Sequence, residues 1–113
     1  MKYLVTGGSG FIGSHLIKCI LKENENSVVN IDKLTYSGKL ENLKDIENNK
    51  NYSFYKTDVC EEKKIYDLLI NYNPDYIFHL AAESHVDRSI SSPYSFMTSN
   101  IMGTYHMLEA TRR

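Results

Sequence analysis

The chain has 113 residues, of which 42% are hydrophobic and 24% charged, and its formal net charge is −1 at pH 7 with histidine neutral. A chain with a net charge this close to zero lacks the excess of Lys and Arg that is typical of nucleic-acid-binding proteins, so we expect no nucleic acid as a partner. No apolar run approaches the roughly 20 residues of a membrane span, and the first residues lack the pattern of a signal peptide, so we expect a cytoplasmic protein with no membrane partner.

A glycine-rich turn between a strand and a helix opens the chain. Residues 2–6 are predicted to form a short buried strand, and residues 11–23 a helix. Gly7, Gly10 and Gly13 lie at this turn, where missing side chains let an anion approach the N–H groups and the positive dipole end of the helix. The alternative is a glycine turn with no ligand. The helix has apolar residues at a spacing that predicts one buried face: Phe11, Ile12, Leu16, Ile17, Ile20 and Leu21.

A second strand, predicted over residues 28–32, ends in an acidic residue. Asp32 follows the last glycine by roughly 20 residues, the distance at which a carboxylate accepts hydrogen bonds from a ribose 2′-hydroxyl and repels a 2′-phosphate. The pattern therefore favours NAD over NADP as the cofactor, and the neighbouring Lys33 weakens that preference a little.

The rest of the chain continues the alternation of strands and helices. This alternation predicts an α/β fold of Rossmann type, with parallel strands in the order 3-2-1-4 and flanking helices, in one domain over residues 1–113. The expected elements are a short helix over 40–46, a strand over 52–57, a helix over 61–72 stopped by Asn73 and Pro74, a strand over 76–80, and a last helix that begins near Pro93 and runs toward Arg113.

The predicted strand order gathers further candidate residues at the carboxyl edge of the sheet. Asp58 could accept a hydrogen bond from an adenine amino group or act as the N-cap of the next helix, and the two roles are compatible. The small or apolar residues Leu80, Ala81 and Ala82 suit a segment that passes beneath a cofactor, and they equally suit ordinary packing at the end of a strand.

The cysteines and histidines show no spacing that is typical of a metal site. Cys19 and Cys60 are far apart and form no C-x-x-C pair, and the four histidines form no H-x-x-x-H motif or Cys/His cluster. We therefore expect reduced thiols and no metal ion.

The stretch after the fourth strand resembles a known family. Residues 79–90, HLAAESHVDRSI, closely resemble the signature of the dTDP-glucose 4,6-dehydratases, which belong to the extended short-chain dehydrogenase/reductase superfamily. Residues 29–38, VNIDKLTYSG, are similar to the cofactor-ribose segment of that family, and residues 99–104, SNIMGT, to its next helix. The resemblance covers the whole chain and implies NAD as the cofactor.

The resemblance also implies roles for individual residues. Phe11 and Ile12 would contact the pyrophosphate through their backbone, and Ser84 would face both the cofactor and the sugar substrate. The other implied cofactor contacts are Asp32, Lys33, Leu34 and Thr35 at the adenosine ribose, Asp58 and Val59 at the adenine, Leu80, Ala81 and Ala82 at the nicotinamide, and Ser99, where the family often has Thr.

The implied reaction converts dTDP-glucose to a 4-keto-6-deoxy sugar nucleotide. NAD+ takes hydride from C4 while a Tyr, its pKa lowered by a nearby Lys, removes the hydroxyl proton. A carboxylate pair then eliminates water across C5 and C6, and NADH returns the hydride to C6. In the family these catalytic residues follow the last helix present here. We therefore expect an N-terminal part of the domain, truncated before the later strands and without its catalytic and substrate-binding remainder, which turns over no dTDP-glucose alone.

One Tyr-x-x-x-Lys match does occur, at Tyr52 and Lys56, but it lies on a predicted strand. Four residues along a strand separate two side chains by roughly 13 Å, whereas the same spacing on a helix makes them neighbours. We therefore expect Tyr52 to be structural and assign no catalytic residue within the chain.

Two other hypotheses remain open: a non-enzymatic module that binds NAD or nothing, and another nucleotide-sugar enzyme, such as an epimerase or a UDP-sugar dehydratase. The family resemblance further implies a homodimer of the full-length enzyme, because the last helix packs there on a partner subunit. In agreement, the apolar residues of this helix occupy more than one face: Phe96, Met97, Ile101, Met102, Tyr105, Met107 and Leu108.

Overall fold

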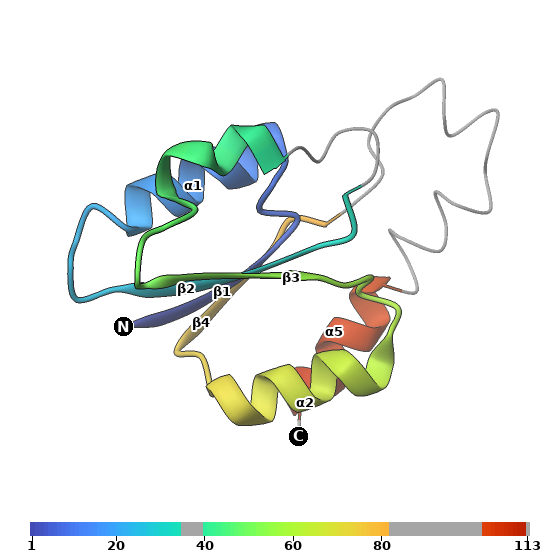
Figure 1. Cartoon of the computed structure of the whole chain (residues 1–113). Helices are drawn as coiled ribbons and strands as arrows, with labels where there is room; N and C mark the ends of the chain where they lie inside the picture. Colours follow the sequence, from blue (N-terminus) through green and yellow to red (C-terminus); the bar gives the residue numbers. More distant parts are fainter. Residues whose placement is uncertain (35–39, 82–102, 113) are drawn as a thin grey trace, which may run out of the picture.

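The computed structural model describes residues 1–34, 40–81 and 103–112 of the chain (Figure 1). Its four strands form one parallel sheet with the order β3-β2-β1-β4, which confirms the predicted topology. The predicted bounds of the strands are right to within one residue at either end. The strands are β1 (Lys2–Thr6), β2 (Ser27–Asp32), β3 (Tyr52–Lys56) and β4 (Tyr76–His79).

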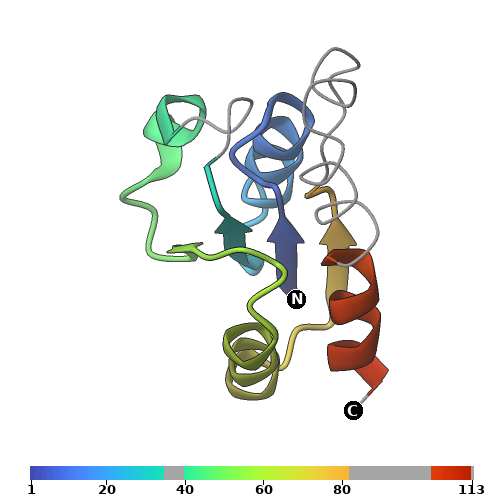
Figure 2. The ribbon, with the colours of Figure 1, turned by 90° about the vertical axis from the view of Figure 1, so that its right-hand side faces the viewer.

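Helices cover both faces of this sheet (Figure 2). One face carries α1 (Phe11–Ile20) and the 3-10 helix η1 (Leu40–Ile46), and the other carries α2 (Glu62–Tyr72) and α5 (Gly103–Arg112). The helices α2 and α5 pack against each other as well as on the sheet. The arrangement is the predicted α/β layering, in which crossover helices protect both faces of a parallel sheet.

Alternate side chains of β1 enter two separate hydrophobic cores, as the two-residue period of a strand requires. Leu4 points toward α2 and α5, where it packs with Ile65 and Met107. Val5 points the other way and packs with Ile17 of α1. Each core therefore joins the sheet to the helices on one of its faces.

The predicted apolar face of α1 is wrong at its first turn. Phe11 and Ile12 are 76% and 71% exposed, whereas Ile17 is fully buried as predicted. The inward side of the first turn consists of the buried Gly13 and Ser14, and the backbone of the glycine turn lies directly against Gly13. Only small residues fit there, so the two large apolar side chains point outward.

The helix α1 also ends three residues earlier than predicted, at Ile20 rather than residue 23. The backbone N–H of Lys22 bonds to the carbonyl of Cys19, so the chain tightens into an i to i+3 turn. The side chain of Asn26 donates to the carbonyl of Ile20 at 3.1 Å. That bond satisfies one of the carbonyls left open at a helix end.

The helix α2 begins within one residue of its predicted start and ends at the predicted residue 72. Ile65 and Leu69 are buried against the sheet. Asn73 ends the helix in the left-handed conformation, with φ 51°, and its N–H bonds to the carbonyl of Leu69 at 2.8 Å. Asn tolerates this conformation better than most residues, which explains the stop signal that the sequence shows there.

The helix α5 is described from Gly103 to Arg112. Met107 is buried against the sheet, whereas Tyr105 and Leu108 are exposed. Apolar residues therefore do lie on more than one face of the described part of this helix. The predicted start near Pro93 lies outside the described residues, as do Phe96, Met97, Ile101 and Met102.

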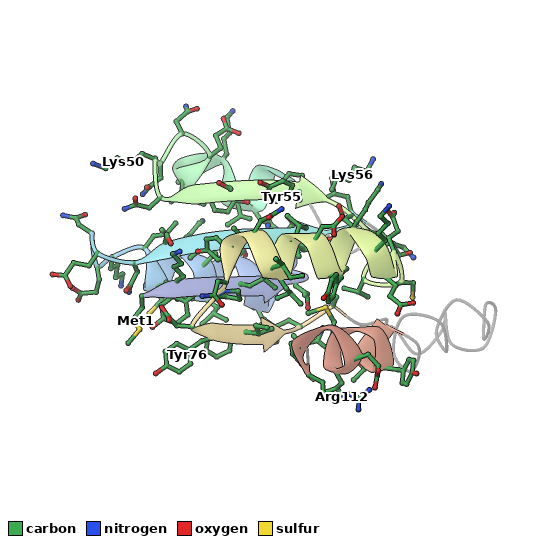
Figure 3. All side chains as sticks on the ribbon, turned by 90° about the horizontal axis from the view of Figure 1, so that it is seen from below. Met1, Lys50, Tyr55, Lys56, Tyr76 and Arg112 are labelled. Carbon is green, nitrogen blue, oxygen red and sulfur yellow. The ribbon has the colours of Figure 1, made fainter. Side chains whose placement is uncertain are left out.

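The described part of the sheet ends at β4 on one side. Tyr76 and Phe78 lie on the same face as α1 but are half-exposed, because α1 does not reach across β4. Their rings stack on Tyr3 of β1, with centroid distances of 5.5 Å and 6.2 Å. Figure 3 shows Tyr76 beside β4 and Tyr55 on β3, at opposite edges of the sheet.

Within residues 1–34, 40–81 and 103–112, no helix has the length and apolar character needed to cross a bilayer. The same ranges contain no group of three or more His, Cys, Asp or Glu residues that could hold a metal ion. Cys19 is exposed and Cys60 is half-buried.

Candidate functional site

The candidate residues lie where the strands end at the carboxyl edge of the sheet. Gly7 follows β1, and its N–H bonds to the carbonyl of Ile31 in β2 at 2.8 Å. Leu80 follows β4, and its N–H bonds to the carbonyl of Thr6 at 3.0 Å. Asp32 closes β2, and its carbonyl accepts from the N–H of Thr57. Four predicted site residues lie outside the described part of the chain: Thr35, Ala82, Ser84 and Ser99.

Gly7 stands at the point where the ends of β1 and β4 meet. Its φ of 71° is in the left-handed region that favours glycine. A Cβ at this position would lie 2.8 Å from the backbone nitrogen of Ala81 and 2.8 Å from the carbonyl carbon of Leu80. The glycine therefore lets the first turn and the segment after β4 touch backbone to backbone.

The N-terminus of α1 is open toward the same edge. Gly10 is the N-cap residue, and no side chain in the described ranges caps this end of the helix. The N–H groups of a first helical turn have no partner within the helix, and they carry the positive end of its dipole. The backbone of Phe11, Ile12 and Gly13 thus provides donors for an anion. The exposure of the Phe11 and Ile12 side chains does not affect this backbone role.

The carboxylate of Asp32 joins two parts of the site. Its Oδ2 accepts from the N–H of Ser9 in the glycine turn at 2.9 Å, and its Oδ1 accepts from the N–H of Leu34 at 2.8 Å. The residue is only 8% exposed. A carboxylate has about four acceptor positions, so two remain for hydroxyl groups such as those of a ribose.

Asp58 forms a turn and an ion pair rather than a helix cap. The N-cap prediction is wrong, because Glu61 occupies the N-cap position of α2. The Oδ1 atom of Asp58 accepts from the N–H of Cys60 at 2.9 Å, and its Oδ2 atom lies 3.4 Å from Lys33 Nζ. The pair brings the ends of β2 and β3 together at the predicted adenosine position. Val59, also assigned there, is buried in the core on the α2 face.

His79 links β1, β4 and α5 through two threonines that the sequence reasoning missed. Its Nδ1 lies 2.7 Å from Thr6 Oγ1, and its Nε2 lies 3.1 Å from Thr104 Oγ1. Thr6 Oγ1 also accepts from the N–H of Ala81 at 3.2 Å, so its own proton is available to Nδ1 while Nε2–H donates to Thr104. Burial lowers the pKa of His79, which favours this neutral form. The sequence signal that indicates this role is the position of His79, a polar residue at the end of an otherwise apolar strand.

Protonation of His79 is expected to destabilise the fold at mildly acidic pH. Because burial depresses the folded pKa of His79, the unfolded chain binds the proton first, at an ordinary pKa of about 6.5. The free energy of unfolding should therefore fall as the pH drops from about 7 through the unfolded pKa toward the lower folded one. The measurement is urea unfolding between about pH 5 and 8.

The variant His79→Gln should lose this part of the pH dependence. His15→Gln is the control, because His15 is exposed and its ring bonds to the Phe11 carbonyl of its own helix. An unchanged pH slope in His79→Gln would contradict the assignment.

Two asparagine side chains that were not among the predicted site residues hold the glycine turn. Asn30 is fully buried in β2, and Asn42 of η1 donates to the carbonyl of Ser9 at 2.9 Å. The signal was present in the sequence, because an amide interrupts the apolar run of β2 two residues before Asp32.

The geometry supports a structural role for Tyr52. Its hydroxyl accepts from Asn30 Nδ2 at 3.1 Å, and burial raises the pKa of Tyr52. A tyrosine that serves as a base needs the opposite shift. Tyr52 and Lys56 occupy the first and last positions of β3, as expected for a pair that does not act together.

The chain is similar in sequence to known nucleotide-sugar 4,6-dehydratases. Residues 4–113 match the family model described as GDP-mannose 4,6 dehydratase. The chain is 52% identical over 113 residues to a dTDP-glucose 4,6-dehydratase of Escherichia coli, and 51% identical over 113 residues to that of Salmonella typhimurium. Each match covers 100% of this chain but 31% of the relative, so the chain spans about a third of the length of these relatives.

Solved structures of similar fold include the dTDP-glucose 4,6-dehydratase DesIV from Streptomyces venezuelae with NAD and TYD bound. It has a TM-score of 0.90 and 36% identity, and the match covers 97% of this chain and 35% of that one. The dTDP-glucose 4,6-dehydratase of Bacillus anthracis in complex with NAD has a TM-score of 0.87 and 33% identity, covering 99% and 34%. The UDP-glucose 4-epimerase of Thermotoga maritima with UDP-glucose has a TM-score of 0.86 and 38% identity, covering 98% and 34%.

Proposed function

Because this chain belongs to the GDP-mannose 4,6 dehydratase family, we propose that it is the NAD-binding part of a dTDP-glucose 4,6-dehydratase. One observation carries the proposal: the glycine turn, the open N-terminus of α1 and the carboxylate of Asp32 meet at one edge of the sheet. That edge is where open α/β sheets bind dinucleotides. The 52% identity to a dTDP-glucose 4,6-dehydratase supports this activity over others in the family.

The described residues fit NAD along the edge from β3 to β4. The pyrophosphate would accept from the N–H groups at the start of α1, beside Gly10, Phe11 and Ile12. The ribose diol would donate to the open acceptor positions of Asp32, with Leu34 alongside. Lys33, which pairs with Asp58, would also lie at the ribose. At the two ends, the adenine would lie near Asp58 and Val59, and the nicotinamide near Leu80 and Ala81.

The residues outside the described part complete the proposed site. Thr35 would extend the ribose contacts, and Ala82 and Ser99 would line the cofactor. Ser84 would contact both cofactor and sugar. These assignments rest on the family resemblance of residues 29–38, 79–90 and 99–104.

In the whole protein, the bound NAD would supply an acceptor that takes hydride from C4 of the sugar and returns it to C6. The chain's own residues would orient that cofactor and leave the proton transfers to a Tyr, a Lys and a carboxylate pair elsewhere in the protein. We place the protein in the cytoplasm, with dTDP-glucose as its substrate.

We further propose that the whole protein is a homodimer through α5. Met107 packs inward on the sheet, which leaves the exposed Tyr105 and Leu108 on the outer faces of the helix. Large apolar side chains at such positions suit burial against a partner subunit.

An epimerase is the second candidate function. It is favoured by the fold similarity to the Thermotoga maritima UDP-glucose 4-epimerase, at a TM-score of 0.86. The identity to that structure is 38%, against 52% to the Escherichia coli dehydratase, so the dehydratase is the better-supported proposal.

Replacing Asp32 with alanine tests the NAD proposal directly. Asp32→Ala should weaken NAD binding by about 10- to 100-fold, because hydrogen bonds to a charged group contribute about 1.5–3 kcal/mol and each 1.4 kcal/mol is tenfold. Isothermal titration of the 113-residue chain with NAD measures this. Asp45→Ala is the control, since Asp45 lies on η1 with an 81% exposed side chain.

The same titration with NADP separates the two tasks of Asp32. Both cofactors depend on the glycine turn that Asp32 holds, but only NADP has the 2′-phosphate that the carboxylate repels. Asp32→Ala should therefore reduce the preference for NAD over NADP. Equal losses for both cofactors would refute the ribose contact, and unchanged NAD affinity would refute the assignment altogether.

A further inference from the structure

A fully buried amide lies beneath the glycine turn. Asn30 is 0% exposed, in the centre of β2, where its register partners are Val5 of β1 and Phe54 of β3. Burial of a primary amide is unfavourable unless its donors and acceptor are satisfied. An apolar side chain in this position would pack into the core on the α1 face without that requirement.

All the polar atoms of Asn30 have partners, and two of these belong to the turn. Its Oδ1 accepts from the N–H of Gly8 at 2.9 Å, and its Nδ2 donates to Ser9 Oγ at 3.2 Å and to Tyr52 Oη at 3.1 Å. A backbone N–H can only donate, so the partner of Gly8 must be the oxygen and the orientation of the amide follows. The amide thus matches a specific conformation of the turn.

Ser9 shows how tightly that conformation is held. It is fully buried, and each of its polar groups is bound by a different side chain. Its N–H donates to Asp32, its Oγ accepts from Asn30, and its carbonyl accepts from Asn42. These three side chains come from β2 and η1, which lie 21 to 33 residues along the chain from Ser9.

The absence of a side chain at Gly8 makes room for the amide of Asn30. A Cβ on Gly8 would lie 2.3 Å from Asn30 Oδ1 and 2.4 Å from the Ile17 side chain. Only glycine lets the amide reach the backbone of the turn at this distance. The turn leads directly into Gly10 and the first N–H groups of α1, so its conformation sets the direction of the donors in the anion site.

We propose that Asn30 is a positioning residue that holds the glycine turn in its pyrophosphate-binding conformation, through Gly8 N–H and Ser9 Oγ. Asn30 does not itself reach the ligand, and Tyr52 supports it from β3. This inference rests on the proposed NAD function, which it deepens by assigning a residue that orders the phosphate site before the ligand arrives.

The test uses Asn30→Leu in the 113-residue chain, because leucine has a similar volume but cannot bond to the turn. The first readout is amide hydrogen exchange of Gly8 measured by NMR without ligand. Exchange at Gly8 should speed up by about tenfold or more, while the amide of Leu4 in β1 keeps its rate. The control is Asn48→Leu, the same substitution at an exposed asparagine.

The second readout is the affinity for NAD compared with adenosine, which has no pyrophosphate. In Asn30→Leu the NAD affinity should fall about tenfold, while the adenosine affinity changes less than about twofold. If Asn30 had only a general structural role, its substitution would lower the affinities for NAD and adenosine equally. Parallel losses, or a protected Gly8 amide with unchanged NAD affinity in the folded variant, would overturn the proposal.

Two further outcomes remain decisive. If Asn30→Leu does not fold, Ser9→Ala takes its place, because it removes only the Oγ contact and keeps the backbone bonds to Asp32 and Asn42. Ser9→Ala should speed the amide exchange of Gly8 and lower the NAD affinity by about threefold. An unchanged exchange rate and an unchanged affinity would overturn the proposal. If the unsubstituted chain binds no NAD, the proposed function fails, and the Gly8 exchange rate alone decides whether Asn30 holds the turn.

Discussion

Gly7→Ala is expected to lower the free energy of unfolding by about 2–5 kcal/mol. An L-residue in the left-handed conformation of Gly7, with φ 71°, costs about 1–2 kcal/mol. Its Cβ would also lie 2.8 Å from the backbone of Leu80 and Ala81, and overpacking of this kind costs about 1–3 kcal/mol. Backbone atoms cannot rotate away as a flexible side chain can, so the ends of β1 and β4 must separate. Urea unfolding followed by circular dichroism measures the loss.

Gly10→Ala is the matched control for this substitution. Gly10 lies three residues further along the same turn, with φ −76° and ψ 179°, a conformation that any residue adopts. Because Gly10 is an N-cap residue, Gly10→Ala should lower the free energy of unfolding by no more than about 1 kcal/mol. Equal stabilities of the two variants would show that backbone contact between the turn and the segment after β4 is not a constraint on the fold.

Ile65→Ala should destabilise the chain by about 2–5 kcal/mol, the usual cost of removing a large aliphatic side chain from a core. Ile65 is 0% exposed and packs with Leu4 and Met107, so it joins α2 to both the sheet and α5. Small domains are stable by only about 5–15 kcal/mol, and this one substitution therefore removes a large fraction of the total.

The helix α2 also contains the control for that experiment. Ile70 is 57% exposed, so Ile70→Ala should change the stability by no more than about 0.5 kcal/mol. Because both substitutions are the same and lie in the same helix, the difference between them isolates burial against the sheet. Similar losses at the two positions would contradict the observed orientation of α2.

The parts of the fold that the sequence predicted correctly depend on neighbouring residues. Short apolar runs in residues 2–6 and 28–32 predicted strands, and the bounds of η1 agree with the predicted 40–46. The alternation of strands and helices then allowed few topologies, because parallel crossovers are right-handed. The same local patterns placed Gly7 and Asp32 at one edge of the sheet.

The errors occurred where a contact between distant residues overrides a local pattern. Phe11 and Ile12 fit a buried face by spacing, but the backbone of the glycine turn occupies the inward side of that helical turn. Asp58 fits an N-cap by residue type, but its carboxylate is engaged by Cys60 and Lys33, and Glu61 holds the cap position.

The sequence by itself determined the fold class, the strand order and the dinucleotide-type turn, because periodicity, glycine spacing and strand-end acids are short-range signals. Only the tertiary structure decided which polar side chains hold the site. Asn30 and Asp32 reach Gly8 and Ser9 across more than 20 residues of chain, and His79 reaches Thr6 across 73. Such contacts depend on the register between strands, which no local pattern encodes, and they exist only once the parallel sheet has brought the strand ends together.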